Sequence, residues 1–211
     1  LMASRLVLAL DETDPARALS IAREVSPFVA KIKINYPLVL SAGLEIVTKI
    51  SEFSSVICDF KVADIPNTNR LITEAAFNAG ASGIIAHAFP GPESLKAIRE
   101  VDSDKELYVV ITMSHPKGGD FFSIEDFCSL ALEAGATGVV APATRPEDVA
   151  KVRNLVGNLK IISPGVGAQG GSSKDTLKAG ADYIIVGRGI YQSDNPAESA
   201  EKYCNDCSID D

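Results

Sequence analysis

Eight short apolar runs recur along the chain at intervals of about 25 residues. Each run is rich in β-branched residues and almost continuously apolar, a pattern typical of parallel strands that are covered by helices. The sequence therefore predicts eight buried strands. The runs begin near Arg5, Val29, Ser55, Gly83, Leu107, Gly138, Lys160 and Tyr183.

Helical signals fill the intervals between these runs. Apolar residues recur there at i, i+3, i+4 and i+7, the spacing of one helix face. We expect one of these helices to end at Gly80 and to bury a face formed by Ile72, Ala75, Ala76 and Ala79. Residues that favour the N-terminal cap of a helix stand ahead of three others. They are Asp14, Ser123 and Asn195.

Eight strand–helix units can form either a doubly wound open sheet or a closed (β/α)8 barrel. Polar residues end many of the strands, and in a barrel those ends converge on one mouth, where enzymes of this fold place their active sites. We therefore predict a TIM barrel in a single α/β domain over residues 1–211, with an N-terminal arm at 1–4 and a polar tail at 204–211. The strand-end residues are Asp11, Lys33, Asp59, His87, Ser114 and Arg188.

Composition and charge narrow the classes of partner. The chain is 46% hydrophobic and 23% charged, so it should fold. Its net charge of −8 argues against a nucleic-acid or membrane-surface binder, which needs a basic footprint. No apolar run approaches the roughly 20 residues that cross a bilayer, and no leader precedes the first strand. We expect a cytoplasmic protein.

The segment Asp59–Asp64 carries the strongest local signal. Asp59 and Lys61 share one side of a strand because strand side chains alternate, and burying either ion alone would cost several kcal/mol. Lys33 has the matching position on the preceding strand, only about 4.8 Å away. The sequence thus predicts a row of alternating charges formed by Lys33, Asp59, Lys61 and Asp64. A structural salt-bridge network is the alternative interpretation, but strand ends favour a functional site.

A glycine-rich segment, residues 165–171, follows the seventh strand. It matches the pattern G-x-G-x-x-G, but a dinucleotide site needs an acidic residue about 20 positions later, at the end of a second strand. Arg188 stands there instead. Barrels often bind phosphate with the loops after strands 7 and 8, and backbone N–H groups with a guanidinium suit that dianion. We expect a phosphate site here.

Weaker signals come from isolated residues. Ser114 follows the fifth strand, where it could bind a substrate amide edge or equally cap a turn. His87 and His115 are too isolated to form a metal site, and His87 is expected to be a core histidine with its hydrogen bonds satisfied. Cys204 and Cys207 form a C-x-x-C pair without the second ligand pair or βαβ context that a zinc or redox site needs.

Several of these segments resemble the archaeal type of orotidine 5′-phosphate decarboxylase, over residues 5–203. The D-x-K-x-x-D element of Asp59, Lys61 and Asp64 also occurs in sugar-phosphate enzymes of the same superfamily. Residues 65–68, the Gln169 loop and Arg188 favour the nucleotide decarboxylase, whereas residues 117–122 have no assigned role. The segments are DFKVADIPNT, KIKINYPLVL, MSHP, SPGVGAQGG and IIVGRGIY.

The resemblance implies decarboxylation of orotidine 5′-phosphate to uridine 5′-phosphate, the last step of de novo pyrimidine nucleotide synthesis, without a metal or organic cofactor. It implies that Lys61, beside Asp59 and Lys33, stabilises charge at C6 of the pyrimidine and donates a proton there. It also implies a homodimer with both active sites at the interface, in which Asp64 and Thr68 reach the partner's site.

The resemblance also implies substrate contacts at residues that match the family. Asp11 and Lys33 would bind ribose hydroxyls, Ser114 the pyrimidine, and Gln169, Gly187 and Arg188 the phosphate. Further substrate-binding residues would be Ile65, Pro164, Gly165, Val166 and Gly167.

Two alternative functions stay open. One is a metal-dependent sugar-phosphate enzyme of the same superfamily, a keto-gulonate-phosphate decarboxylase or a hexulose-phosphate synthase. The other is a catalytically silent barrel that binds nucleotides.

Overall fold

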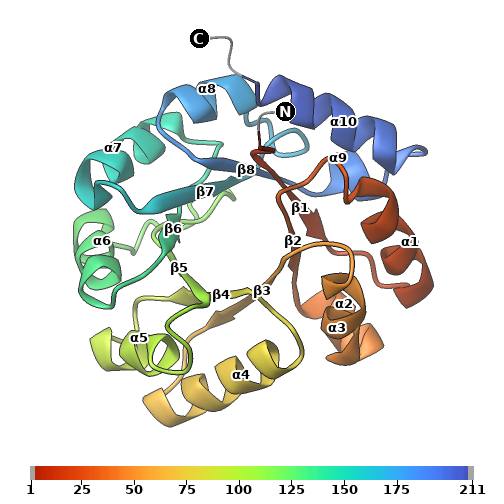
Figure 1. Ribbon diagram of the computed structural model, residues 1–211. Helices are drawn as coiled ribbons and strands as arrows, with labels where there is room; N and C mark the ends of the chain where they lie inside the picture. Colours follow the sequence, from red (N-terminus) through yellow and green to blue (C-terminus); the bar gives the residue numbers. More distant parts are fainter. Residues whose placement is uncertain (1–2, 209–211) are drawn as a thin grey trace.

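In residues 3–208, which the computed structural model describes, eight parallel strands close into a barrel and helices surround it (Figure 1). The strands neighbour one another in chain order, and β8 pairs with β1. The predicted strands and the predicted (β/α)8 fold are both confirmed. The strands are β1 (Leu6–Leu10), β2 (Lys31–Ile34), β3 (Val56–Val62), β4 (Gly83–His87), β5 (Glu106–Val110), β6 (Gly138–Val140), β7 (Lys160–Pro164) and β8 (Tyr183–Val186).

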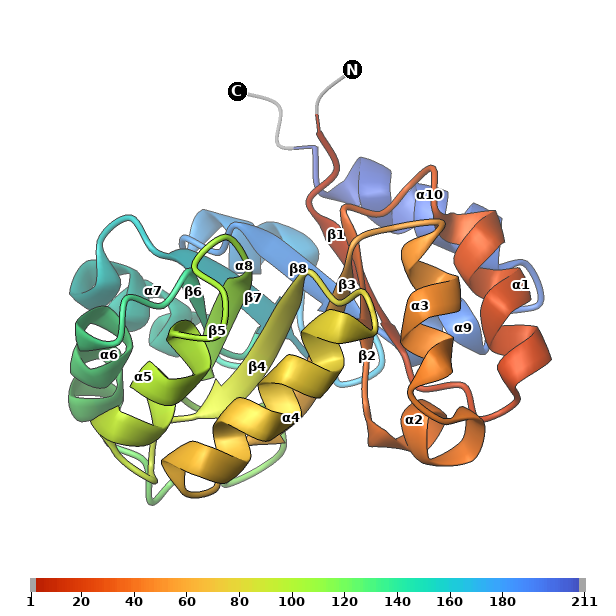
Figure 2. The ribbon, with the colours of Figure 1, turned by 60° about the horizontal axis from the view of Figure 1, so that its bottom comes forward.

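The helices form the outer layer, and Figure 2 shows α4 and α5 packed beside each other outside β4. Residues 204–206 belong to the last helix, whereas residues 1–2 and 209–211 of the predicted arm and tail lie outside the described residues. The helices are α1 (Pro15–Val25), α2 (Tyr36–Ala42), α3 (Glu45–Ser51), α4 (Pro66–Asn78), α5 (Pro92–Arg99), α6 (Ile124–Glu133), α7 (Pro146–Val156), α8 (Ser173–Lys178), α9 (Arg188–Tyr191) and α10 (Pro196–Asp206).

The predicted helix caps are present. The side chains of Asp14, Ser123 and Asn195 each accept a hydrogen bond from a backbone N–H in the first turn of their helix, at 3.0–3.2 Å. Gly80 follows α4 with φ +107, a backbone conformation that suits glycine at a helix end. These contacts satisfy N–H groups that have no partner within the helix and fix where each helix starts.

The predicted buried face of α4 is partly wrong. Of the four residues expected there only Ala76 is buried, and Ala75 is exposed. Asn69 and Thr73 are buried instead, because their polar groups are satisfied. The Asn69 amide donates to the Ser94 carbonyl at 3.1 Å, and the Thr73 hydroxyl donates to the Asn69 carbonyl at 2.7 Å. Apolar periodicity cannot anticipate a buried face that is held by hydrogen bonds.

Both faces of each strand are buried, which explains the continuous apolar runs. Along β1, Leu6, Leu8 and Leu10 pack outward against the helices, whereas Val7 and Ala9 point into the barrel. The inner cluster fills the barrel, so the barrel is a packed core rather than a pore. The cavity that polar side chains line lies at the C-terminal ends of the strands.

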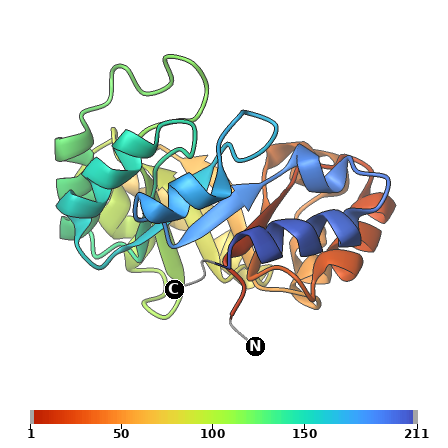
Figure 3. The same ribbon diagram turned by 90° about the horizontal axis from the view of Figure 1, so that it is seen from above.

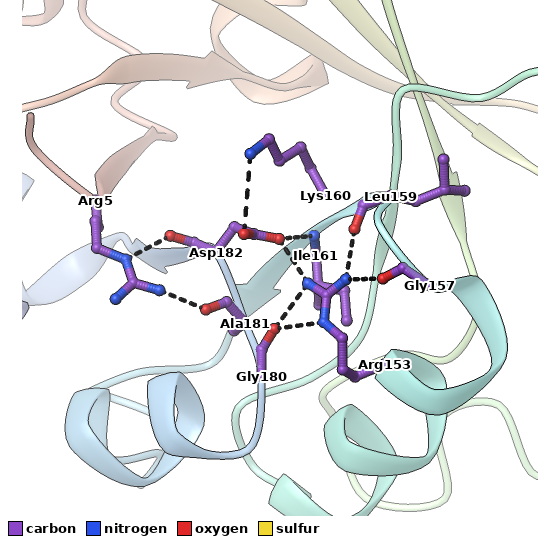
Figure 4. A network of polar contacts seen from close by, with 9 residues as sticks. All are labelled: Arg5, Arg153, Gly157, Leu159, Lys160, Ile161, Gly180, Ala181 and Asp182. Carbon is purple, nitrogen blue, oxygen red and sulfur yellow. Dashed lines mark hydrogen bonds and ion pairs between the residues drawn. The ribbon is translucent and has the colours of Figure 1, made fainter.

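The N-terminal face is held by a polar network that links α7 to the chain before β7 and β8 (Figure 4). Arg153 donates five hydrogen bonds, of 2.5–3.0 Å, to backbone carbonyls and to the Asp182 carboxylate. Arg5 donates to the carbonyls of Ala181 and Asp182 at 2.7 and 2.9 Å. These contacts satisfy the carbonyls between α8 and β8, so we assign this face to stability rather than catalysis.

Candidate active site

A cavity of about 230 Å³ lies at the C-terminal ends of the strands. The loops after β5 and β7 project on this same side of the barrel (Figure 3). Most of the residues singled out from the sequence meet here. Those lining the cavity are Asp11, Lys33, Asp59, Lys61, Ser114, Pro164, Gly165, Val166, Gln169, Gly187 and Arg188. Those outside its lining are Asp64, Ile65, Thr68 and Gly167.

Three charged side chains form a continuous row on the cavity wall. The Lys33 ammonium lies 2.8 Å from a carboxylate oxygen of Asp59, and the Lys61 ammonium lies 2.9 Å from both oxygens of that carboxylate. Asp59 is only 3% exposed and Lys33 7%. The predicted contact between Lys33 and Asp59 is therefore present, and Asp59 holds both ammonium groups.

The electrostatics keep the inner part of this row charged. Burial alone would raise the pKa of Asp59, but the charges of Lys33 and Lys61 outweigh it and hold that pKa below its usual value. Burial alone would lower the pKa of Lys33, but Asp59 and Asp11 outweigh it and raise that pKa. Two opposite charges next to each other thus stabilise one another in a buried site.

The backbone of β3 is irregular at this row. Cys58 pairs with Ile84 and Val62 pairs with Ala86, so four steps along β3 match two along β4. The extra residues form a bulge, a feature that redirects side chains next to active sites. Lys61 lies in the bulge with φ 42, a left-handed conformation that costs a non-glycine residue on the order of 1 kcal/mol or more. The fold holds Lys61 in a strained position.

Lys31 shows why position along the strand matters. It lies on β2 two residues before Lys33, but at the opposite end of the barrel, and its ammonium pairs with Glu106 at 2.7 Å. It does not line the cavity in the described chain. Two lysines on the same face of one strand therefore have separate surroundings.

Asp64 does not complete the predicted row within its own chain. Among residues 3–208 it makes no ion pair with Lys61, and its side chain accepts a hydrogen bond from the N–H of Ile65 at 2.7 Å. Its backbone is anchored to buried residues: the Asp64 N–H donates to Asn69 at 2.9 Å, and the Ser94 hydroxyl donates to the Asp64 carbonyl at 2.8 Å. Asp64 is thus held at the exposed rim of the barrel.

One unsatisfied group points to a ligand. A carboxylate oxygen of Asp11 is buried and has no hydrogen-bond partner within the described residues. Because an unpaired buried oxygen costs about 1–3 kcal/mol, a hydroxyl group of a bound molecule would relieve it. Asp11 directly follows β1 and lines the cavity together with Lys33 of the neighbouring strand β2.

The other end of the cavity is lined by the loops after β7 and β8. The glycine-rich loop folds back on itself, since the Gly171 N–H donates to the Gly165 carbonyl at 2.9 Å. Gln169 and Gly187 line this end, and Arg188 brings its guanidinium there from the start of α9. The arrangement gathers hydrogen-bond donors where the sequence predicted a phosphate.

The expectation that His87 is a core histidine with satisfied hydrogen bonds is only partly right. It is buried at the end of β4 as predicted, but its Nδ1 has no hydrogen-bond partner in residues 3–208. Its ring packs against Phe89 and Phe122, with centroids at 5.1 and 5.9 Å. Burial, with the nearby charge of Lys61, lowers the pKa of His87 to about 4. The imidazole is therefore neutral beside the charged row of Lys33, Asp59 and Lys61.

A consequence for stability follows from this pKa. The unfolded chain binds a proton at His87 below its ordinary pKa of 6.5, and the folded chain only near pH 4, so stability falls as pH drops between these values. Between pH 7 and pH 5 we expect the parent to lose on the order of 1–2 kcal/mol more unfolding free energy than His87→Gln. Urea titrations at both pH values measure this difference; equal losses would contradict the depressed pKa.

Sequence reasoning missed the residues that hold the loop after β5. Arg145 donates to the Thr112 hydroxyl at 3.0 Å, the Gly118 carbonyl at 3.1 Å and the Met113 carbonyl. This contact fixes the chain on both sides of Ser114. No local motif marks Arg145, because its role depends on a loop about 30 positions away. Two further residues also line the cavity near strand ends and were detectable by that criterion: Asn35 directly follows β2, and Thr112 lies two residues after β5.

Two kinds of feature are absent from the described residues. No helix in residues 3–208 is long and apolar enough to cross a membrane. In that same part of the chain, no three residues among His, Cys, Asp and Glu are grouped so as to hold a metal ion. A reaction without metal stays a prediction.

Comparisons with known proteins agree with this geometry. Residues 4–203 match the family model described as orotidine 5′-phosphate decarboxylase / HUMPS family. The chain is 58% identical to the orotidine 5′-phosphate decarboxylase of Methanococcoides burtonii over 208 residues, which cover 96% of this chain and 97% of that protein. The identity is 47% over 204 residues for the Thermococcus kodakarensis decarboxylase, covering 94% of each.

A solved structure extends the likeness to three dimensions. The crystal structure of the Methanocaldococcus jannaschii orotidine 5′-monophosphate decarboxylase, complexed with the inhibitor BMP, superposes with a TM-score of 0.93 at 42% identity. The match covers 99% of this chain and 100% of that one. The fold is therefore shared over nearly the whole chain.

Proposed function

This chain belongs to the orotidine 5′-phosphate decarboxylase / HUMPS family. We propose that the charged row of Lys33, Asp59 and Lys61 catalyses the decarboxylation of orotidine 5′-phosphate. The protein converts orotidine 5′-phosphate to uridine 5′-phosphate and carbon dioxide, as a carboxy-lyase. The relatives described above carry the decarboxylase name, which separates the chain from the sugar-phosphate enzymes of the superfamily. One observation carries the assignment of residues: an ammonium held 2.9 Å from a buried carboxylate on the cavity wall.

The reaction breaks the bond between C6 and the carboxylate carbon, and the electron pair stays on C6. Lys61 opposes this developing negative charge with its ammonium and then donates a proton from Nζ to C6. Asp59 keeps that ammonium in place through two contacts of 2.9 Å. Asp59 also lies where it would crowd the substrate carboxylate, which favours loss of CO2.

The rest of the nucleotide fits the remaining surfaces of the cavity. Asp11, with its unsatisfied oxygen, and Lys33 bind ribose hydroxyls. Ser114 binds the amide edge of the pyrimidine, and its loop is fixed because the Thr144 hydroxyl donates to the Ser114 carbonyl at 3.0 Å. Apolar side chains such as Ile85 line the cavity between these groups, and the low dielectric strengthens each charge that acts there.

The phosphate lies at the far end, against the glycine-rich loop, Gly187 and Arg188. Its contacts supply binding energy away from the reacting carbon, and that energy can be used in the transition state. Arg188 is exposed, so its guanidinium is available to a dianion. Pro164, Gly165 and Val166 line this end and shape it.

Arg188→Ala tests the phosphate assignment. We expect kcat/KM for orotidine 5′-phosphate to fall by about 10–150-fold, the effect of losing a charge-assisted contact of about 1.5–3 kcal/mol. The nucleoside orotidine lacks the phosphate, so its kcat/KM should stay within about twofold of the parent value. Steady-state assays of both substrates measure the two effects. Equal losses for nucleotide and nucleoside would show that Arg188 does not bind the phosphate.

A second copy of the chain completes the proposed site. Large apolar side chains are exposed outside the barrel: Leu40 on α2 is 81% exposed, Ile65 before α4 is 64% and Phe89 after β4 is 56%. A homodimer would cover such side chains and remove their apolar surface from water. It would also bring the rim residues Asp64 and Thr68 to the partner's cavity, where Asp64 completes the charged row.

A further inference from the structure

The last helix supports both elements that form the proposed phosphate site. α10 packs against α8, which follows the glycine-rich loop, and against α9, which begins with Arg188 (Figure 1). Tyr203 lies in the second half of α10 and is half-buried. Its hydroxyl oxygen lies close to the glycine-rich loop on one side and to α9 on the other.

The geometry of two glycines shows how closely the phenol fits. A Cβ added to Gly167 would lie 2.6 Å from the Tyr203 hydroxyl oxygen, and a Cβ added to Gly189 would lie 2.8 Å from it. Real carbon atoms are essentially never this close to such a neighbour. The hydroxyl oxygen therefore sits against the backbone of the loop on one side and of α9 on the other.

We propose that Tyr203 is a positioning residue for the phosphate site. Gly167 stands two residues before Gln169, and Gly189 directly follows Arg188, so the phenol lies against the backbone within two residues of both proposed phosphate-binding side chains. The phenol stands between the glycine-rich loop and α9 and sets the distance between them; we call this contact the wedge. Because a misplacement of about 1 Å can cost roughly 100-fold in rate, this spacing governs how well the dianion is held. The inference rests on the proposed phosphate site.

A pair of substitutions tests how closely Tyr203 packs against Gly189. Gly189 is not in a left-handed conformation, so alanine suits its backbone, and the obstacle is the Tyr203 oxygen at 2.8 Å, with ring carbons at 3.4 Å. Gly189→Ala should push α9 and Arg188 away and lower kcat/KM for orotidine 5′-phosphate by about 10-fold or more. Adding Tyr203→Phe removes the oxygen and should restore kcat/KM to within about threefold of the Tyr203→Phe single variant.

The nucleoside separates positioning from general damage. Tyr203→Ala removes the wedge, so kcat/KM should fall for orotidine 5′-phosphate and stay unchanged for orotidine, in samples shown by circular dichroism to be folded. If Tyr203→Phe fails to rescue Gly189→Ala, or if both substrates lose equally, the wedge is wrong. Arg188→Ala serves as reference: if it lowers kcat/KM equally for the nucleotide and the nucleoside, the phosphate site itself is misassigned, whereas a loss confined to the nucleotide limits the failure to Tyr203.

Discussion

Lys61→Ala should lose at least about 10³–10⁴-fold in kcat while the protein stays folded and still binds uridine 5′-phosphate. A positioned general acid contributes about 10²–10⁴-fold, and removal of a preorganised charge opposite the developing carbanion adds to that loss. The fold should survive, because Asp59 keeps its other partner, Lys33, at 2.8 Å. The decrease in orotidine 5′-phosphate absorbance, followed with chelator present, measures the rate.

Lys31→Ala is the matched control for this variant. Lys31 is also a lysine paired with a carboxylate inside the barrel, with its ammonium 2.7 Å from Glu106, but it lies at the end away from the cavity. Its removal should lower stability and leave kcat of the folded protein within a few-fold of the parent. A Lys61→Ala enzyme within threefold of the parent kcat, or a Lys31→Ala enzyme equally inactive while folded, would rule out the proposed role of Lys61.

Much of the fold was predictable because two physical patterns repeat. Strands buried on both faces need continuous apolar runs, and eight such runs separated by helices correspond to the eight strands of the barrel. Helix starts were predictable because their caps are local: Asp14 lies two residues before Ala16, from whose N–H it accepts a hydrogen bond. The buried face of α4 was not predictable, since Asn69 and Thr73 are buried through contacts that include α5, far along the chain.

The candidate site likewise has a part that the sequence predicts and a part that it does not. The contact between Lys33 and Asp59 follows from strand alternation and the spacing of neighbouring strands, both of which are properties of regular β-structure. The bulge that places Lys61 at φ 42 depends on how β3 pairs with β4, which no local pattern encodes. Arg145 was missed for the same reason, because its partners are carbonyls of a distant loop. Site residues at strand ends can be predicted from the sequence, whereas the loop contacts that complete the site cannot.

Asp64 distinguishes a shared active site from a self-contained barrel. In its own chain it lies at the rim, outside the cavity and held by Asn69 and Ser94. Its carboxylate accepts a hydrogen bond from the Ile65 N–H and forms no ion pair with Lys61 in residues 3–208. If a second copy brings it next to Lys61, each active site needs residues from two chains. Asp64→Ala and Lys61→Ala should then both be inactive alone, each for lack of one residue per site.

Mixing the two inactive variants should restore activity. We expect about a quarter of the parent activity when equal amounts of Lys61→Ala and Asp64→Ala are unfolded together and refolded. Random pairing makes half of the dimers mixed, and each mixed dimer has one site with both lesions and one with neither. Each variant refolded alone is the control, and mass analysis verifies that mixed dimers form. If mixed dimers are present and the activity stays at the level of the separate variants, Asp64 acts within its own chain and the shared-site proposal is wrong.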